Sequence, residues 1–181
     1  AAVPSDVLVV IDEAYNEYIP QTERVDTAAW LAEFPNLVIT RTFSKIYGLA
    51  GLRVGYAMAS AEVADLMNRV RQPFNCNNLA IAGAAAALED EAFVDRSYAL
   101  NRAGMEQIVC GLKRLGYAHI PSHGNFLAFN AGDAVALNQK LLKQGVIVRP
   151  IAGYGMPEWL RVTIGSETEN ARFLEALELA Q

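Results

Sequence analysis

A lysine, an arginine and two hydroxyl side chains lie close together in the segment TRTFSKIYGLAGLRVGY, residues 40–56. The ε-amine of Lys45 can capture an aldehyde as an imine if its surroundings make it nucleophilic. Thr42 and Ser44 add hydroxyl groups, and Arg53 adds a fixed positive charge whose planar donors suit the oxygens of a phosphate. The segment therefore combines the groups needed to hold a small molecule that carries both an aldehyde and a phosphate.

A second set of polar side chains follows an apolar run near the start of the chain. In VLVVIDEAY, residues 7–15, Asp12 and Tyr15 come directly after β-branched residues typical of a buried strand covered on both faces. A carboxylate can keep a pyridine nitrogen protonated, and a phenol can bind a phenolate oxygen. Together with Lys45, these residues indicate pyridoxal 5′-phosphate as the cofactor.

The strands that carry these residues must end at one edge of a sheet if the side chains are to meet. Residues 7–11 and 37–43 are predicted strands, and a short helix is predicted between them at residues 26–34. Strand, helix and strand in this order form a βαβ unit whose strands are parallel neighbours or near-neighbours. We therefore expect Asp12 and Lys45 to follow the carboxyl ends of these strands, where open α/β sheets bind ligands.

Residues 53–60 form a third predicted strand. Only seven residues separate Lys45 from Arg53, whereas a parallel crossover needs about a dozen or more. The third strand must therefore run antiparallel. An antiparallel return places Arg53 at the start of its strand, on the same sheet edge as Lys45.

The rest of the chain favours helices and then short strands. The apolar run LAIAGAAAAL at residues 79–88 predicts a buried helix, and a helix break is expected near Asp90. Helices are predicted at residues 61–72, 78–115, 133–144 and 167–180, and strands at residues 124–130, 146–150 and 159–165. The predicted class is α/β, with a mostly parallel sheet that includes one antiparallel strand, followed by a smaller α+β domain.

Composition and charge argue against several classes of function. The chain has 181 residues, a net charge of −5 and no basic stripe, so we expect no nucleic-acid partner. Its longest apolar run is shorter than the roughly 20 residues of a membrane span, so we expect no membrane partner. Cys76 and Cys110 have no histidine at ligand spacing, and no metal site is predicted. Because the chain lacks an initiating methionine and opens almost at once on a core strand, we expect further chain upstream.

Four motifs resemble those of pyridoxal phosphate enzymes of the aspartate aminotransferase fold type. They are DEAY at residues 12–15, TFSK at 42–45, GLRVGY at 51–56 and GYGMPEWLRVTIG at 153–165. Within this fold type the chain is most similar to the histidinol-phosphate aminotransferase family, because the motifs stand in the family's order and at its spacing. The resemblance covers essentially all of the chain, but it corresponds only to the C-terminal half of such an enzyme.

The resemblance implies a domain assignment and a set of cofactor-binding roles. Residues 1–77 would be the C-terminal part of the large cofactor-binding domain, and residues 78–181 would be the interdomain helix and the small C-terminal domain. Lys45 would bind the cofactor covalently and later move the substrate α-proton, Asp12 would pair with the pyridine nitrogen, and Tyr15 would bind the phenolate oxygen. The residues implied for the cofactor phosphate are Thr42, Ser44 and Arg53.

Two arginines are implied as substrate ligands. Arg161 stands within an otherwise apolar predicted strand, where burial is costly without an anion or an internal ion pair. By resemblance it grips the substrate α-carboxylate. Arg149 matches the arginine that binds the substrate phosphate in histidinol-phosphate aminotransferases, although a salt bridge to a nearby acid is an equally open interpretation. Asn125 and Tyr154 are further candidates for the same cavity.

The activity implied by the resemblance is transamination of small amino and keto acids. The specific reaction would convert L-histidinol phosphate and 2-oxoglutarate to imidazole-acetol phosphate and L-glutamate, in histidine biosynthesis. A full-length enzyme of this kind would be a cytoplasmic homodimer. We expect the 181 residues alone to bind the cofactor weakly and not to turn over, because such enzymes build the site from both halves of the large domain and a second subunit.

Three alternatives remain open at this point. The same motifs are similar to those of phosphothreonine decarboxylases and of aromatic aminotransferases, which share the fold. The choice of reaction depends on which bond at the substrate Cα stands perpendicular to the cofactor ring, and sequence does not specify that angle. A non-catalytic alternative is the aminotransferase-like sensor domain of a transcription regulator, which a basic DNA-binding segment upstream would indicate.

Overall fold

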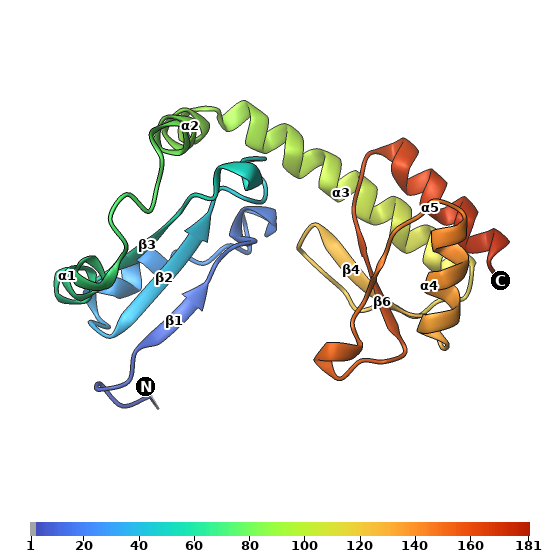
Figure 1. Ribbon diagram of the computed structural model, residues 1–181, viewed down its shortest axis with the longest axis horizontal. Helices are drawn as coiled ribbons and strands as arrows, with labels where there is room; N and C mark the ends of the chain where they lie inside the picture. Colours follow the sequence, from blue (N-terminus) through green and yellow to red (C-terminus); the bar gives the residue numbers. More distant parts are fainter. Residues whose placement is uncertain (1–2) are drawn as a thin grey trace. The chain divides into compact units, whose positions relative to one another are not determined.

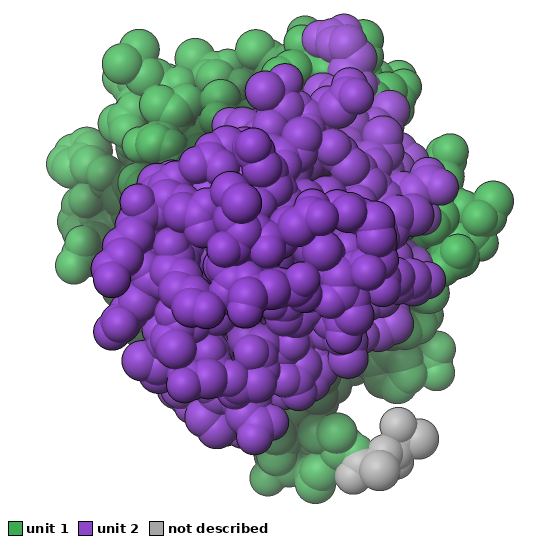
Figure 2. Space-filling model, turned by 90° about the vertical axis from the view of Figure 1, so that its right-hand side faces the viewer, with its two compact units in different colours: residues 1–95 green, residues 96–181 purple. Residues whose placement is uncertain are grey.

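The computed structural model describes residues 3–181. The chain divides into two compact units, Ala1–Asp95 and Arg96–Gln181, whose elements are labelled in Figure 1 and which are coloured separately in Figure 2. The dividing point lies within a long helix, α3 (Glu91–Arg114). The assignment of residues 1–77 and 78–181 to the large and small domains of an aminotransferase stays a prediction.

The first unit contains a three-stranded sheet (Figure 1). Its strands are β1 (Val9–Asp12), β2 (Leu37–Thr42) and β3 (Gly55–Ala59), in the order β1-β2-β3. β1 runs parallel to β2, and β3 runs antiparallel to β2, so both predicted directions are confirmed. The predicted helix between the first two strands is a 3-10 helix, Thr27–Ala32.

Short polar side chains cap the N-termini of the helices that start in the first unit. Ser60 accepts a hydrogen bond from the Val63 amide at the start of α1 (Ala61–Val70). Asn77 does the same for α2 (Asn78–Glu89). The expected break near residue 90 is the N-cap of α3, where the Asp90 carboxylate accepts from the Phe93 amide at 3.0 Å. Each cap satisfies an amide that has no partner inside its helix.

Two predictions of burial are wrong for this chain. The first strand was expected to be covered on both faces, but Val10 is 60% exposed. The helix at residues 79–88 was expected to be buried, but Leu79 and Ile81 are 76% and 55% exposed. Alanines on its other face, such as Ala80, belong to a core cluster with Phe43 and Val54, which flank β2 and β3. The apolar pattern of both segments is real, but among the described residues no surface covers these two faces.

The second unit is an antiparallel sheet packed against helices. Its strands are β4 (Phe126–Asn130), β5 (Arg149–Pro150) and β6 (Trp159–Thr163), in the order β4-β6-β5. Two further helices, α4 (Ala134–Lys143) and α5 (Glu167–Leu179), pack with α3 on one sheet face. The strand residues that face this core are Leu127, Phe129, Leu160 and Val162. Because side chains alternate along a strand, Arg161 belongs to the opposite face.

No described helix is long and apolar enough to cross a membrane. Within residues 3–181, no three His, Cys, Asp or Glu side chains gather in a group that would hold a metal ion.

Gly55 allows β3 to approach β2 closely, and this contact generates a prediction. A Cβ atom at Gly55 would lie 2.6 Å from the Arg41 carbonyl oxygen, which as part of the backbone cannot move away freely. We expect Gly55→Ala to lower the free energy of unfolding by about 1–3 kcal/mol, measured by denaturant unfolding. Gly51→Ala is the matched control, because a Cβ there meets nothing within 4 Å. Equal unfolding midpoints for the two variants would contradict the close approach.

Candidate active site

The turn after β1 holds the two residues predicted from the DEAY motif. The Asp12 carboxylate accepts a hydrogen bond from the Ala14 amide at 3.0 Å. The ladder to β2 continues one residue further, because the Glu13 amide donates to the Thr40 carbonyl at 2.9 Å. Tyr15 then precedes a short 3-10 helix, Asn16–Tyr18. Asp12 and Tyr15 thus lie where the first strand of the sheet ends.

Lys45 lies beside Tyr15. Its ammonium nitrogen is 5.1 Å from the centre of the Tyr15 ring, which is a cation–π distance. The two residues come from the ends of parallel neighbouring strands, so the sheet brings together side chains that are thirty positions apart in the sequence. A lysine amine and a phenol therefore lie next to each other at this sheet edge.

The predicted phosphate ligands meet in the loop between β2 and β3. The Ser44 amide donates to the Thr42 hydroxyl oxygen at 3.1 Å. The Arg53 guanidinium donates to the Ala50 carbonyl at 2.9 Å and to the Ser44 hydroxyl oxygen at 3.4 Å. Three of the predicted ligands are thus linked in one cluster of hydrogen-bond donors suited to an anion.

Arg53 differs from its predicted position in the strand. It precedes β3 and adopts a left-handed backbone conformation, with φ 54° and ψ 47°. This conformation costs a non-glycine residue roughly 1–2 kcal/mol. The two hydrogen bonds of its guanidinium help to hold it there.

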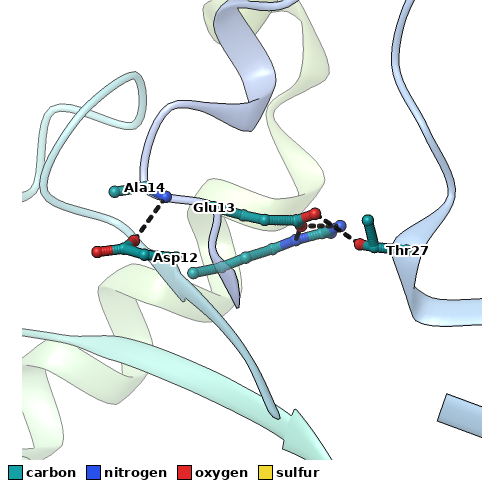
Figure 3. Close-up of polar contacts among 5 residues, drawn as sticks. Asp12, Glu13, Ala14 and Thr27 are labelled. Atoms are coloured by element: carbon teal, nitrogen blue, oxygen red, sulfur yellow. Dashed lines mark hydrogen bonds and ion pairs between the residues drawn. The ribbon is translucent and has the colours of Figure 1, made fainter. Parts of the chain in front are cut away.

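Sequence analysis missed an ion pair next to this site, between the buried Glu13 and the partly exposed Arg41. The Arg41 guanidinium lies 2.8 Å from Glu13 Oε2, and the Thr27 hydroxyl donates to Glu13 Oε1 at 2.5 Å. Figure 3 shows the Asp12 and Glu13 side chains pointing in opposite directions, with Glu13 toward Thr27. Burial lowers the pKa of Arg41, but hydrogen bonds with Tyr56 and Glu13 raise it above its usual value. The signal available in the sequence was the placement of Glu13 and Arg41, an acid and a base, at the ends of two neighbouring predicted strands.

The two predicted substrate arginines face each other in the second unit. Arg149 on β5 is the direct cross-strand partner of Arg161 on β6. The Arg161 guanidinium lies 4.6 Å from the Phe126 ring centre, and its Nε is buried without a hydrogen-bond partner among the described residues. Like charges placed opposite each other are destabilising, and a buried donor needs an acceptor. An anion would relieve both conditions.

A cavity of about 410 Å³ opens beside Arg161. Its lining is mainly apolar and comprises Ile120, Pro121, Ser122, Phe126, Leu127, Ala128, Ile151, Tyr154, Met156 and Arg161. Tyr154 therefore lines the cavity. Asn125 is absent from this lining, and its carbonyl accepts from the Ile164 amide at the edge of the sheet. Arg149 has no ion-pair partner among residues 3–181, which disfavours the salt-bridge interpretation.

Comparison with known families decides the evolutionary relationship of the chain. The model of the family described as aminotransferase class I and II matches residues 2–177. The chain belongs to this aminotransferase family. A relative from Dechloromonas aromatica, histidinol-phosphate aminotransferase 1, is 77% identical over 178 residues, covering 98% of this chain and 49% of the relative. The chain therefore spans about half the length of the relatives it matches.

Solved structures of aminotransferases share the fold. The histidinol-phosphate aminotransferase from Sinorhizobium meliloti, in complex with pyridoxal-5′-phosphate, superimposes with a TM-score of 0.90 at 29% identity, covering 99% of this chain and 50% of that one. The L-threonine-O-3-phosphate decarboxylase from Porphyromonas gingivalis superimposes with a TM-score of 0.82 at 25% identity, covering 97% and 55%. The predicted α/β class and the resemblance to the aspartate aminotransferase fold type are confirmed.

Glu17, in the 3-10 helix beyond Tyr15, generates a pH-dependent prediction. Burial raises the pKa of Glu17 above its usual value, against a smaller opposing effect of Arg41. A raised pKa in the folded state means that the contribution of Glu17 to stability is fully present below the pKa of the unfolded chain. This contribution is lost as the pH rises through the folded pKa. We expect Glu17→Gln to raise the melting temperature relative to the native chain more at pH 7 than at pH 4.

The matched control is Glu33→Gln, at an exposed glutamate of the same unit. Melting temperatures of both variants and the native chain would be measured across this pH range. The same pH dependence for both substitutions would contradict a desolvated Glu17.

Proposed function

We propose that this chain carries the covalent-lysine half of a pyridoxal-phosphate-dependent aminotransferase. The proposed reaction converts L-histidinol phosphate and 2-oxoglutarate to imidazole-acetol phosphate and L-glutamate, in histidine biosynthesis. The contact of Lys45 with Tyr15, on the sheet edge that also holds Arg53 and Ser44, is the observation that carries the proposal. Identity of 77% to a histidinol-phosphate aminotransferase supports the choice of substrate.

The residues at the end of the first sheet fit pyridoxal 5′-phosphate. When bound, this cofactor supplies an electron sink for the carbon that carries the amino group. Lys45 would hold the aldehyde carbon through its Nζ atom, and Tyr15, beside it, would donate its hydroxyl proton toward the phenolate oxygen. Asp12 would accept a hydrogen bond from the protonated pyridine nitrogen. The anion-binding groups proposed for the phosphate are Thr42, Ser44 and Arg53.

Lys45 also fits the role of proton carrier. Once its amine is released by the incoming amino group of the substrate, Nζ would take the proton from the substrate α-carbon and return it to the neighbouring cofactor carbon. Tyr15 would restrict the amine to the region above its ring. Lys45, Asp12 and Tyr15 are thus the proposed catalytic residues.

Arg149 and Arg161 are the proposed substrate ligands. Their direct opposition across β5 and β6, and the unpartnered Nε of Arg161, support binding of an anionic substrate in the second unit. We assign the substrate phosphate to Arg149 and the α-carboxylate of the amino-acid substrate to Arg161. Bidentate guanidinium groups suit both anions.

Decarboxylation of phosphothreonine is the second candidate, and the likeness to the Porphyromonas gingivalis decarboxylase favours it. That substrate also carries a phosphate and an amino group, so the same arginines would bind it. Product analysis separates the two reactions. Glutamate formed from histidinol phosphate and 2-oxoglutarate supports transamination, and carbon dioxide released from phosphothreonine supports decarboxylation.

The proposed enzyme includes protein beyond these 181 residues. We propose a cytoplasmic homodimer for the full-length enzyme, and the exposed apolar residues of β1 and α2 support association with more protein. Because the chain spans about half of its relatives, we propose that it binds the cofactor weakly and does not turn over alone. The protein to test is therefore a chimera, in which residues 1–181 replace the matched half of the Dechloromonas aromatica relative.

The covalent role of Lys45 is tested first. We expect Lys45→Ala in the chimera to abolish the visible absorbance of the bound cofactor and to lower transamination by about 10²–10⁴-fold. Borohydride reduction and peptide mapping would locate the adduct on Lys45 in the unmodified chimera. Lys113→Ala, at an exposed lysine of α3, is the control and should retain both signals. An adduct on another residue would refute the assignment.

The substrate role of Arg149 generates a second measurement. We expect Arg149→Gln to lower kcat/KM for histidinol phosphate by about 10–100-fold, because a charge-assisted hydrogen bond is lost. The loss should be much smaller for histidinol, which lacks the phosphate. Arg114→Gln removes an exposed arginine of α3 and serves as control. Equal losses for the two substrates would exclude a phosphate-binding role.

A further inference from the structure

Glu13 is a buried carboxylate that the proposed chemistry does not use. Only 8% of its side chain is exposed. Arg41 donates to one carboxylate oxygen through Nε at 2.9 Å and lies 2.8 Å from it through Nη2. Thr27 donates to the other oxygen at 2.5 Å. Both oxygens are therefore satisfied, and we call Glu13, Thr27 and Arg41 the sheet-edge clamp (Figure 3 shows Glu13 and Thr27).

The sheet-edge clamp joins each element that carries a proposed cofactor ligand. Glu13 directly follows β1, and Arg41 lies on β2, four residues before Lys45. Arg41 is also the cross-strand partner of Tyr56 on β3. Thr27 begins the 3-10 helix that connects β1 to β2. One carboxylate thus ties the ends of two strands to a third strand and to the connecting helix.

Glu13 lies in the DEAY turn between Asp12 and Tyr15, so the contacts of the sheet-edge clamp also restrain the backbone of these two residues. Asp12 and Glu13 are consecutive residues whose side chains point in opposite directions (Figure 3), so contacts that fix Glu13 on one side also restrain the direction of Asp12 on the other. Within residues 3–181, the Asp12 carboxylate accepts a single hydrogen bond, from the Ala14 amide. The Glu13 carbonyl accepts from the Asn16 amide at 3.1 Å, which sets the path of the chain through Tyr15.

Stability alone does not account for this arrangement. Replacement of a buried ion pair by apolar residues of similar size is often neutral or stabilising, because both charges must be desolvated. The contacts of Glu13 instead fix its orientation, since two nitrogens of the partly exposed Arg41 hold one carboxylate oxygen and Thr27 holds the other.

We propose that Glu13, held by Arg41 and Thr27, is a positioning residue that aims Asp12 and Tyr15 toward the space beside Lys45. This inference rests on the proposed function, because it gives the sheet-edge clamp a purpose only if Asp12 and Tyr15 bind the cofactor. Glu13 itself touches neither substrate nor cofactor in this role.

Three variants of the chimera test the inference. Glu13→Gln keeps the shape of the side chain and removes its charge. The double variant Glu13→Leu, Arg41→Met removes both charges together, so that no unpaired buried charge is left. Glu178→Gln is the control, because it breaks an exposed pair of the same chemistry with Arg114 in the second unit.

The first measurement needs no cofactor. Hydrogen exchange of the Ala14 and Asn16 amides should accelerate about tenfold in Glu13→Gln, because these amides bond to Asp12 and to the Glu13 carbonyl. The control variant should exchange as the unmodified chimera does. Unchanged exchange in Glu13→Gln would overturn the inference.

The second measurement follows the bound cofactor. We expect the dissociation constant of pyridoxal 5′-phosphate to rise about tenfold in Glu13→Gln and in the double variant. We also expect the pH midpoint of the visible absorbance to shift, a signal that loss of stability alone does not move. A double variant with native cofactor affinity and native pH midpoint, whatever its melting temperature, would overturn the positioning role.

The failure of the proposed function has a different signature. The proposed function fails if the unmodified chimera forms no borohydride-stable bond at Lys45, and the positioning role then fails with it. If that bond forms normally and the Glu13 variants bind and titrate as the unmodified chimera does, only the positioning role is lost.

Discussion

Parallel pairing of β1 with β2 is the constraint on which the proposed site depends. The pairing sets Asp12 opposite Thr40 and extends through the Glu13 amide. Residues after the two strands therefore emerge at one edge, and Lys45 reaches Tyr15 there. The antiparallel return of β3 then brings the loop that contains Arg53 back to Ser44. Three separate segments of the chain meet because of two strand pairings.

Much of this arrangement could be predicted from the sequence because it follows from chain length and apolar pattern. The seven residues between Lys45 and Arg53 exclude a parallel crossover, which fixed the direction of β3. The apolar run before Asp12 fixed the place where the first strand ends. Asp90 marked the end of one helix and the start of the next, since its side chain caps α3.

Other features depend on contacts that a local pattern does not contain. The left-handed conformation of Arg53 lies in the loop between β2 and β3, and an arginine does not signal that conformation. The pairing of Glu13 with Arg41 needs the register of two strands, which sequence analysis did not specify. The exposure of β1 and α2 depends on which surfaces cover them, and an apolar pattern indicates only that some surface should.

The backbone of Arg53 has a consequence for the engineering of this fold. Glycine adopts the left-handed region with almost no steric penalty, so evolution toward heat resistance alone would favour replacing the arginine. Such a substitution would remove the guanidinium that lies beside Ser44. A more stable backbone at this position would therefore remove the group that we propose for binding the cofactor phosphate.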